Sequence, residues 1–120
     1  MHFTTVVPSV FYTDISDGLK LFVDCLQFTI GHKDLSASQP YCVLRKDGIT
    51  IMLFQDEQLA NEHNPELRLV TDNIEEVYAK VSAYHPHLLH PNLDKVTMRP
   101  WGAKEFVILD NQVGIRIQQW

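Results

Sequence analysis

The sequence has little cysteine, little basic charge and no long apolar run. Its two cysteines, Cys25 and Cys42, stand in apolar surroundings without Cys-x-x-Cys or metal-ligand spacing, so we expect reduced core thiols. Ten Lys and Arg against fifteen Asp and Glu give a net charge of -5, which argues against nucleic acid as a partner. No apolar run approaches the roughly 18 residues that span a bilayer, and the N-terminus lacks a cationic signal region. We expect a cytoplasmic protein with no membrane partner.

The composition that is present fits one globular domain over residues 1–120. Hydrophobic residues make up 45% of the chain and charged residues 21%, a balance typical of folded domains rather than of tails or repeat arrays. A chain of this length buries roughly two-thirds of its unfolded surface. It should therefore fold without disulfides or a structural metal.

The first half predicts a strand, a helix and three further strands. Residues 2–12 are rich in Thr, Val, Phe and Tyr and predict a strand. Apolar residues at three- and four-residue spacing predict a helix over 17–26, with Ser16 as its N-cap. Three strands are expected at 28–33, 41–45 and 49–54, and Asp47-Gly48 favours a tight turn between the last two. The polar stretch 55–64 has no periodicity and predicts a linker.

The second half repeats this order of elements. A strand over 66–71 precedes a helix that Asn73 caps and that ends near Tyr84. A short 88–89 segment, a proline-bearing loop over 91–101 and strands at 104–109 and 114–119 follow. The chain therefore predicts two tandem βαβββ modules, about 1–57 and 64–120. We expect an α+β fold in which both modules form a curved mixed sheet, with helices on the convex face and a concave face open to a ligand.

Two groups of residues carry a family resemblance. In the first half, Asp14-Ile15, Phe22 and Leu26-Gln27-Phe28 follow a pattern of Asp, helix aromatic and Leu-Gly-Phe, with Gln27 in place of the Gly. In the second half, Pro100-Trp101-Gly102 precedes a charged residue, an aromatic and Asp110. On these residues the chain resembles the vicinal oxygen chelate superfamily, also called the glyoxalase/bleomycin-resistance/dioxygenase superfamily.

The resemblance implies where a metal would be held, and those positions lack suitable donors. Most enzymes of the superfamily hold a divalent metal with one side chain from each of four strands. The corresponding positions here are Val7, Met52 or Leu53, Glu66, and Arg116, or Gln118 if the last strand shifts by one pleat. Glu66 alone is a plausible donor, and even a catalytic site needs about three protein ligands. We therefore expect no metal, no cofactor and no catalytic residue.

Strand alternation predicts which side chains line the pocket. If the leucines of the 66–71 strand and the isoleucines of the last strand face the helices, the cavity is lined by Glu66, Arg68, Arg116 and Gln118. Tyr41 and Phe54 are candidate aromatic walls from the first half. Trp101 is the best candidate for stacking on a flat ligand, because no periodicity places it in the core. Each has a structural alternative: cross-strand pairing for the charged residues and core packing for the aromatics.

These residues lead to a hypothesis of binding without catalysis. The resemblance implies a bleomycin-resistance-type homodimer whose grooves, between the subunits, sequester a cationic aromatic glycopeptide-like antibiotic. The acidic net charge fits such a ligand, whereas Arg68 and Arg116 would favour an anion. One alternative is a metal-dependent lyase, dioxygenase or thiol transferase of the same superfamily that uses Glu66, Gln118 and a histidine such as His2. The other is a binding module for an unrelated metabolite.

Overall fold

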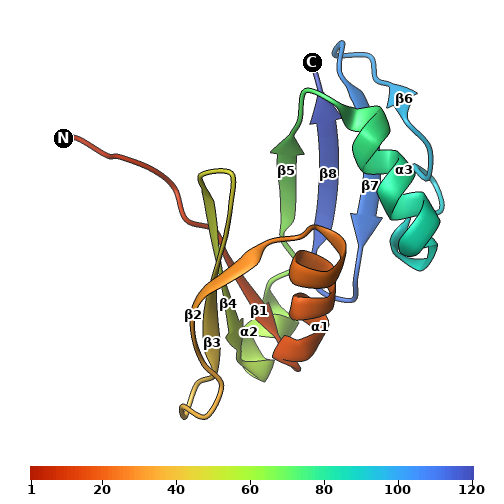
Figure 1. The fold of residues 1–120 in the computed structure, drawn as a ribbon. Coiled ribbons are helices and arrows are strands. Elements are labelled where there is room, and N and C mark those ends of the chain that lie inside the picture. Colours follow the sequence, from red (N-terminus) through yellow and green to blue (C-terminus); the bar gives the residue numbers. More distant parts are fainter. The chain divides into compact units, whose positions relative to one another are not determined.

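The computed structural model describes all 120 residues, which divide into two compact units, residues 1–63 and 64–120 (Figure 1). Each unit contains its own four-stranded mixed sheet and its own helices. None of the helices has the length and apolar character that crossing a bilayer requires.

The first unit is built around strands β1 (Ser9–Tyr12), β2 (Thr29–Asp34), β3 (Tyr41–Lys46) and β4 (Ile49–Gln55). Helix α1 (Ile15–Leu19) continues into a π-helical turn, η1 (Lys20–Cys25), and a short helix, α2 (Glu57–Glu62), follows β4. Strand β1 pairs with β4 in parallel, and β3 pairs with β4 and β2 in antiparallel fashion. The resulting strand order is β1-β4-β3-β2.

The first helix begins two residues earlier than the sequence predicts. Asp14, not Ser16, is the N-cap, because its Oδ1 accepts a hydrogen bond from the Ser16 N–H at 3.0 Å. Gly18 lets the helix approach the sheet closely: a Cβ there would lie 2.5 Å from the Tyr12 ring and 2.9 Å from Leu53. The helix is therefore packed directly on β1 and β4.

Two other predictions for this unit are wrong and one is confirmed. The strand predicted over 2–12 begins only at Ser9, because residues before it have no strand partner and are largely exposed. The predicted linker over 55–64 contains α2, which Asp56 caps; it buries only Ala60, so it has no apolar periodicity. The Asp47-Gly48 turn is confirmed: φ is 51° and 81°, as a two-residue hairpin turn of type I′ requires.

Both cysteines are free. Cys42 is fully buried, and Cys25 is partly exposed. Burial raises the pKa of the Cys25 thiol to about 11, so this thiol is protonated at neutral pH.

The second unit repeats the topology of the first. Its elements are β5 (Glu66–Val70), α3 (Ile74–Tyr84), a 3-10 turn η2 (Pro86–Leu88), β6 (Thr97–Met98), β7 (Lys104–Leu109) and β8 (Gly114–Gln119). Strand β5 pairs with β8 in parallel, and β7 pairs with β8 and β6 in antiparallel fashion, giving the order β5-β8-β7-β6. The same strand order in both units confirms an α+β fold of two tandem modules.

One strand of this unit lies where a loop is predicted. The third strand of the module is the two-residue β6, inside the predicted loop 91–101. The 88–89 segment forms the end of η2 and a single bridge between Leu89 and Ile108. Two paired residues are too few to produce a detectable alternation in the sequence.

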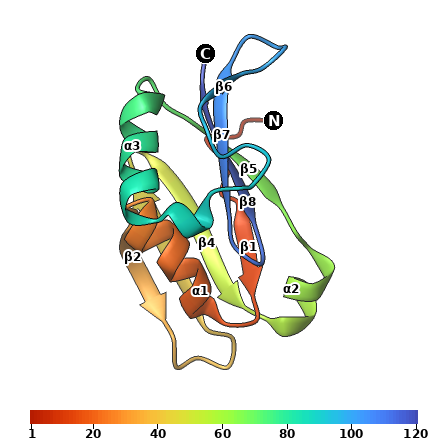
Figure 2. The same ribbon diagram turned by 90° about the vertical axis from the view of Figure 1, so that its right-hand side faces the viewer.

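Helix α3 packs on one face of the second sheet (Figure 2). Asn73 caps it as predicted, accepting from the Glu76 N–H at 3.3 Å. The Tyr78 ring meets the Phe106 ring edge-to-face at 5.1 Å, and the other buried side chains at this interface include Ile74, Val81, Ile108 and Ile115. Because side chains alternate along a strand, the residues between these ones on β7 and β8 lie on the other face.

The end of the first helix carries backbone strain. Gln27 has φ 65°, in the left-handed region that glycine adopts freely. Its N–H donates to the Val23 carbonyl at 3.1 Å, and the Phe28 N–H donates to the Phe22 carbonyl at 2.8 Å. Gln27 stands where the family pattern has glycine, and the positive φ gives the physical reason for that glycine.

We expect Gln27→Gly to raise the free energy of unfolding by about 0.5–1 kcal/mol. Glycine removes the strain of the left-handed conformation, and the greater entropy of the unfolded chain offsets part of this gain. Urea denaturation measures the change. Gln27→Ala is the matched control, because alanine keeps a Cβ and therefore the strain; a glycine variant no more stable than the alanine variant would contradict this prediction.

Candidate functional site

The Pro100-Trp101-Gly102 segment forms the tip of the hairpin that joins β6 to β7. The Gly102 N–H donates to the Arg99 carbonyl at 3.0 Å, and the Arg99 N–H donates to the Ala103 carbonyl at 2.8 Å. Gly102 has φ 97°. In such a three-residue loop, proline fixes the φ angle of the first residue, and glycine adopts the left-handed conformation that the last residue needs. Trp101 lies between them, and its side chain is 47% exposed.

Glu105, on β7, fixes the indole of Trp101. Its side chain is completely buried. Glu105 Oε2 accepts hydrogen bonds from Trp101 Nε1 and from Gln118 Nε2, both at 2.6 Å, and Oε1 accepts from Arg116 Nη1 at 3.1 Å. Burial by itself raises the pKa of this carboxyl, but the three hydrogen bonds and the charge of Arg116 outweigh it. The net pKa is lowered, so Glu105 is an ionised carboxylate at neutral pH.

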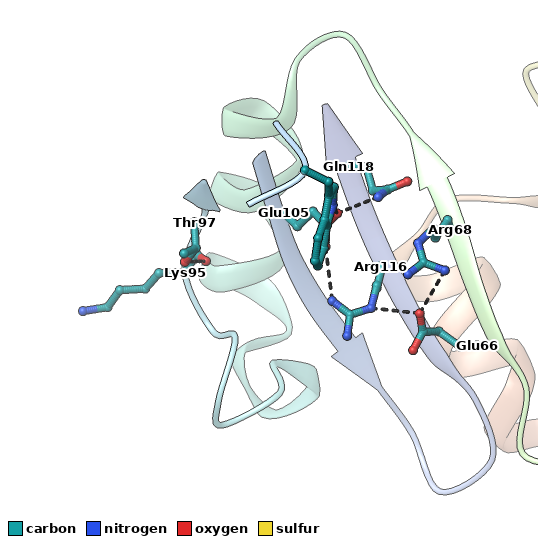
Figure 3. A network of polar contacts seen from close by, with 8 residues as sticks. Glu66, Arg68, Lys95, Thr97, Glu105, Arg116 and Gln118 are labelled. Carbon is teal, nitrogen blue, oxygen red and sulfur yellow. Dashed lines mark hydrogen bonds and ion pairs between the residues drawn. The ribbon is translucent and has the colours of Figure 1, made fainter. Parts of the chain in front are cut away.

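The network continues from β8 to β5 (Figure 3). Arg116 Nε donates to Glu66 Oε1 at 2.8 Å, and Arg68 Nη1 lies 3.3 Å from the same oxygen. Arg68 is opposite Arg116 in the strand register, and Gln118 is opposite Glu105. These side chains therefore share the sheet face opposite α3. We call this the polar face, made of Glu66, Arg68, Glu105, Arg116 and Gln118.

A hollow of about 230 Å³ lies beside the polar face. It is lined by Arg68, Trp101, Gln118 and Trp120. Trp120 is 68% exposed, so two largely accessible indoles border the same small space. Indoles offer large apolar surfaces on which a flat ring can pack. We call this space the indole hollow; Arg68 is the charged residue in its lining.

The structure places the seven predicted site residues in two groups. Trp101, Arg68 and Gln118 line the indole hollow, and Glu66 and Arg116 join them through the polar face. Tyr41 and Phe54 lie in the first unit, opposite each other on β3 and β4. The Tyr41 hydroxyl is 2.9 Å from His32 Nε2, and the Phe54 ring stacks on Phe11 with centroids 5.6 Å apart. Both are partly exposed.

The polar face does not fit a divalent metal. Glu66 Oε1 already contacts the guanidinium groups of Arg116 and Arg68, and these charges would repel a cation. Arg116 has no lone pair to donate, and Gln118 is held in place by the hydrogen bond that its Nε2 donates to Glu105 Oε2. No group of three or more His, Cys, Asp or Glu side chains is arranged to hold a metal. The residues present thus do not match the metal chemistry that the resemblance implies for enzymes.

Sequence reasoning missed Glu105 and Trp120. A signal for Glu105 existed, because alternation within the Lys104–Leu109 strand puts it on the face opposite Phe106, four residues after Trp101. Trp120 follows Gln119, which pairs with Lys104, so the β7–β8 register carries it toward the hairpin of Trp101. That register is not readable from the sequence alone.

We expect the stability that Glu105 contributes to depend on pH. A carboxyl with a lowered folded-state pKa stabilises the fold fully above its unfolded pKa, near 4.5, and loses that contribution as pH falls through the folded-state value. Glu105→Gln should lower the free energy of unfolding at pH 7 by about 1–3 kcal/mol, because charge-assisted hydrogen bonds are lost. The difference from the parent should shrink below about pH 4.5.

Urea denaturation of the parent and of Glu105→Gln at pH 7 and at pH 3 measures the difference in their free energy of unfolding at each pH. Glu75→Gln is the matched control, because Glu75 is an exposed glutamate on α3. It should change the stability by less than about 0.5 kcal/mol. A Glu105→Gln effect that is equally large at both pH values would argue against an ionised Glu105.

Comparison with known proteins identifies the fold. No protein-family model and no curated protein sequence matches this chain. A bleomycin-binding protein complexed with bleomycin matches with a TM-score of 0.73 and 18% identity, covering 98% of this chain and 99% of that one. TnmS3, an antibiotic-binding protein from Streptomyces sp. CB03234, matches with a TM-score of 0.75 and 16% identity, covering 99% and 98%.

A third match carries the superfamily name. It is a glyoxalase/bleomycin resistance protein/dioxygenase superfamily member from Sphaerobacter thermophilus DSM 20745, with a TM-score of 0.74, 16% identity and coverage of 98% of both chains. At such identities the matches establish a shared fold. This chain has the fold of the glyoxalase/bleomycin-resistance/dioxygenase superfamily over nearly its whole length.

Proposed function

We propose that this protein binds a small molecule with a flat aromatic ring and sequesters it without transforming it, as a bleomycin-resistance-type protein does. The indole hollow carries this proposal. Trp101 and Trp120 expose 47% and 68% of their surface around one space. Packing a flat ring between or against these indoles would remove apolar surface from water, at roughly 25 cal/mol per Å².

Trp101 is held in place before any ligand arrives. The hairpin fixes its backbone, Glu105 accepts its indole N–H, and the Arg99 guanidinium lies over its ring with Cζ 5.0 Å from the centroid. A side chain that is already ordered loses little conformational freedom on binding. This arrangement supports a binding surface rather than a mobile loop residue.

The ionised groups of the polar face support binding rather than catalysis. Glu105 is buried and accepts three hydrogen bonds, and Glu66 contacts two guanidinium groups. The Glu105 carboxylate is therefore not available as a general base or nucleophile in this arrangement. The names of the bleomycin-binding and antibiotic-binding proteins that share this fold support the same proposal.

The finer proposal concerns the ligand charge and the assembly. A net charge of -5 attracts a cationic aromatic glycopeptide-like antibiotic over a distance, while Arg68 in the hollow directs the cationic part of the ligand away from the ring site. We propose that two copies form a homodimer with ligand grooves between the subunits. In the first unit, all six residues of β2, an edge strand, are exposed, and proteins normally cover or blunt such edges.

We expect the fluorescence of Trp101 to change when metal-free bleomycin is titrated into a Trp120→Phe variant, in which Trp101 is the one remaining tryptophan. Trp101→Ala should weaken binding by about twofold to thirtyfold, because stacking with a cationic aromatic group is worth about 0.5–2 kcal/mol. Its thermal midpoint should fall by a few degrees, because the variant loses one hydrogen bond to the buried Glu105 but little buried apolar surface. Mass spectrometry should recover bleomycin with unchanged mass.

Tyr84→Ala is the control for this experiment, because Tyr84 is an aromatic of the same unit, 76% exposed, outside the indole hollow. It should leave the affinity unchanged. An equal loss of affinity in both variants would contradict the proposal. A Trp101→Ala variant that melts far below the parent would assign Trp101 to the core instead.

We expect static light scattering at micromolar concentration to return about twice the chain mass of 13.9 kDa. A second copy would cover exposed apolar side chains such as Ile30 and Val6, which a small monomer leaves in water. A measured mass of 13.9 kDa would exclude grooves shared between subunits.

A further inference from the structure

A second and larger cavity, of about 410 Å³, lies within the second unit. The start of β5, the loop before β6, strand β7 and the β7–β8 turn all contribute to its lining. Its apolar wall includes Leu93, Val107, Leu109 and Val113. Its volume falls within the range of roughly 300–1,000 Å³ that small-molecule sites occupy. The cavity therefore has room and an apolar surface for the body of a small ligand.

Arg99 lines this cavity with a donor that has no acceptor. Its Nε is buried and forms no hydrogen bond, and its guanidinium takes part in none of the ion pairs that engage Arg68 and Arg116. The guanidinium lies over the Trp101 ring. A guanidinium that is engaged through its face keeps its in-plane N–H donors for another partner. The Nε itself is closed to a ligand in this conformation, so a ligand in the cavity would meet the terminal Nη groups of Arg99.

The other charged residues of the lining are already engaged. Glu66 is bound by two guanidinium groups, and Arg116 contacts both Glu66 and Glu105. Asp110 Oδ1 accepts from the backbone N–H groups of Gln112 and Val113 at 2.8 and 2.9 Å. Among the charged side chains of the lining, Arg99 is thus the one with a buried nitrogen that has no acceptor. A monoanion balances the Arg99 charge, whereas Glu66 and Asp110 repel a dianion about twice as strongly.

We infer that this cavity binds a small apolar molecule through its carboxylate, with Arg99 as the bidentate partner. Two parallel N–H donors of a guanidinium match the two oxygens of a carboxylate. The apolar wall would hold the rest of the molecule. The inference does not rest on the proposed aromatic ligand, because none of the four residues that line the indole hollow lines this cavity.

The test compares phenylacetate with its neutral analogue phenylacetamide, which has the same shape. Binding is followed by ¹H–¹⁵N NMR titration, in which the Arg99 Nε–H signal is assigned by its loss in Arg99→Gln. We expect phenylacetate to bind about tenfold more tightly than phenylacetamide and to shift the Arg99 Nε–H signal. Arg99→Gln should remove this preference. Arg99→Lys should restore only part of it, because an ammonium group cannot form the bidentate pair.

Lys95→Gln is the matched control, since it removes the same charge from an exposed side chain that points away from the polar face (Figure 3). It should leave the affinity for phenylacetate unchanged, as should Trp120→Ala, which removes one wall of the indole hollow. Thermal unfolding checks that each variant is folded. Failure of the bleomycin experiment would leave these expectations intact, because they depend on Arg99 and not on Trp120.

Four results would overturn the inference. The first is no shift of the Arg99 signal at millimolar phenylacetate, and the second is equal affinity for the acid and the amide. The third is an equal loss of affinity in Lys95→Gln or Trp120→Ala, which would indicate a general charge effect or binding in the hollow. The fourth is tighter binding of inorganic phosphate than of phenylacetate, which would replace the carboxylate with a different anion.

Discussion

The buried carboxylate of Glu105 is the interaction on which the second unit's candidate site depends. A charge removed from water is stable only when donors surround it, and here the indole of Trp101, the amide of Gln118 and the guanidinium of Arg116 supply them. These three donors come from the hairpin tip and from β8, so one anion holds both in place. Through Arg116 the same network reaches Glu66 on β5.

This network also determines which arginine side chains of the unit form ion pairs with carboxylates. Arg68 and Arg116 are neutralised by carboxylates on the polar face, whereas Arg99 is engaged only through its contact with the Trp101 ring. The consequence is two neighbouring but different surfaces. The indole hollow offers aromatic packing with no free acid, and the larger cavity offers an unpaired cation beside apolar walls. No group of three or more His, Cys, Asp or Glu side chains is arranged to hold a metal beside either surface.

Backbone conformation explains several residue choices in the two modules. The Asp47-Gly48 and Pro100-Trp101-Gly102 segments have the residues that their hairpin geometries require. The Asp-Gly pair is the reason that the first of these turns could be predicted from the sequence. Gln27 departs from this logic, since it holds a positive φ with a side chain present. The close contact of Gly18 with Tyr12 shows the reverse case, in which space rather than φ requires glycine.

The sequence by itself determined the two-module repeat and the side of the sheet on which Glu66, Arg68 and Arg116 lie, because periods of 3.6 and 2 residues are local properties of a chain. It predicted a strand over residues 2–12, of which only Ser9–Tyr12 forms one, and no helix after β4. Propensity does not show whether a partner strand exists or whether a helix buries only one residue. Only the tertiary structure decided that Trp101 meets Glu105, that Trp120 joins it, and that Arg99 is left unpaired. Hydrogen-bond partners depend on strand register and on what competes for each charge, and neither is encoded within a single segment of the chain.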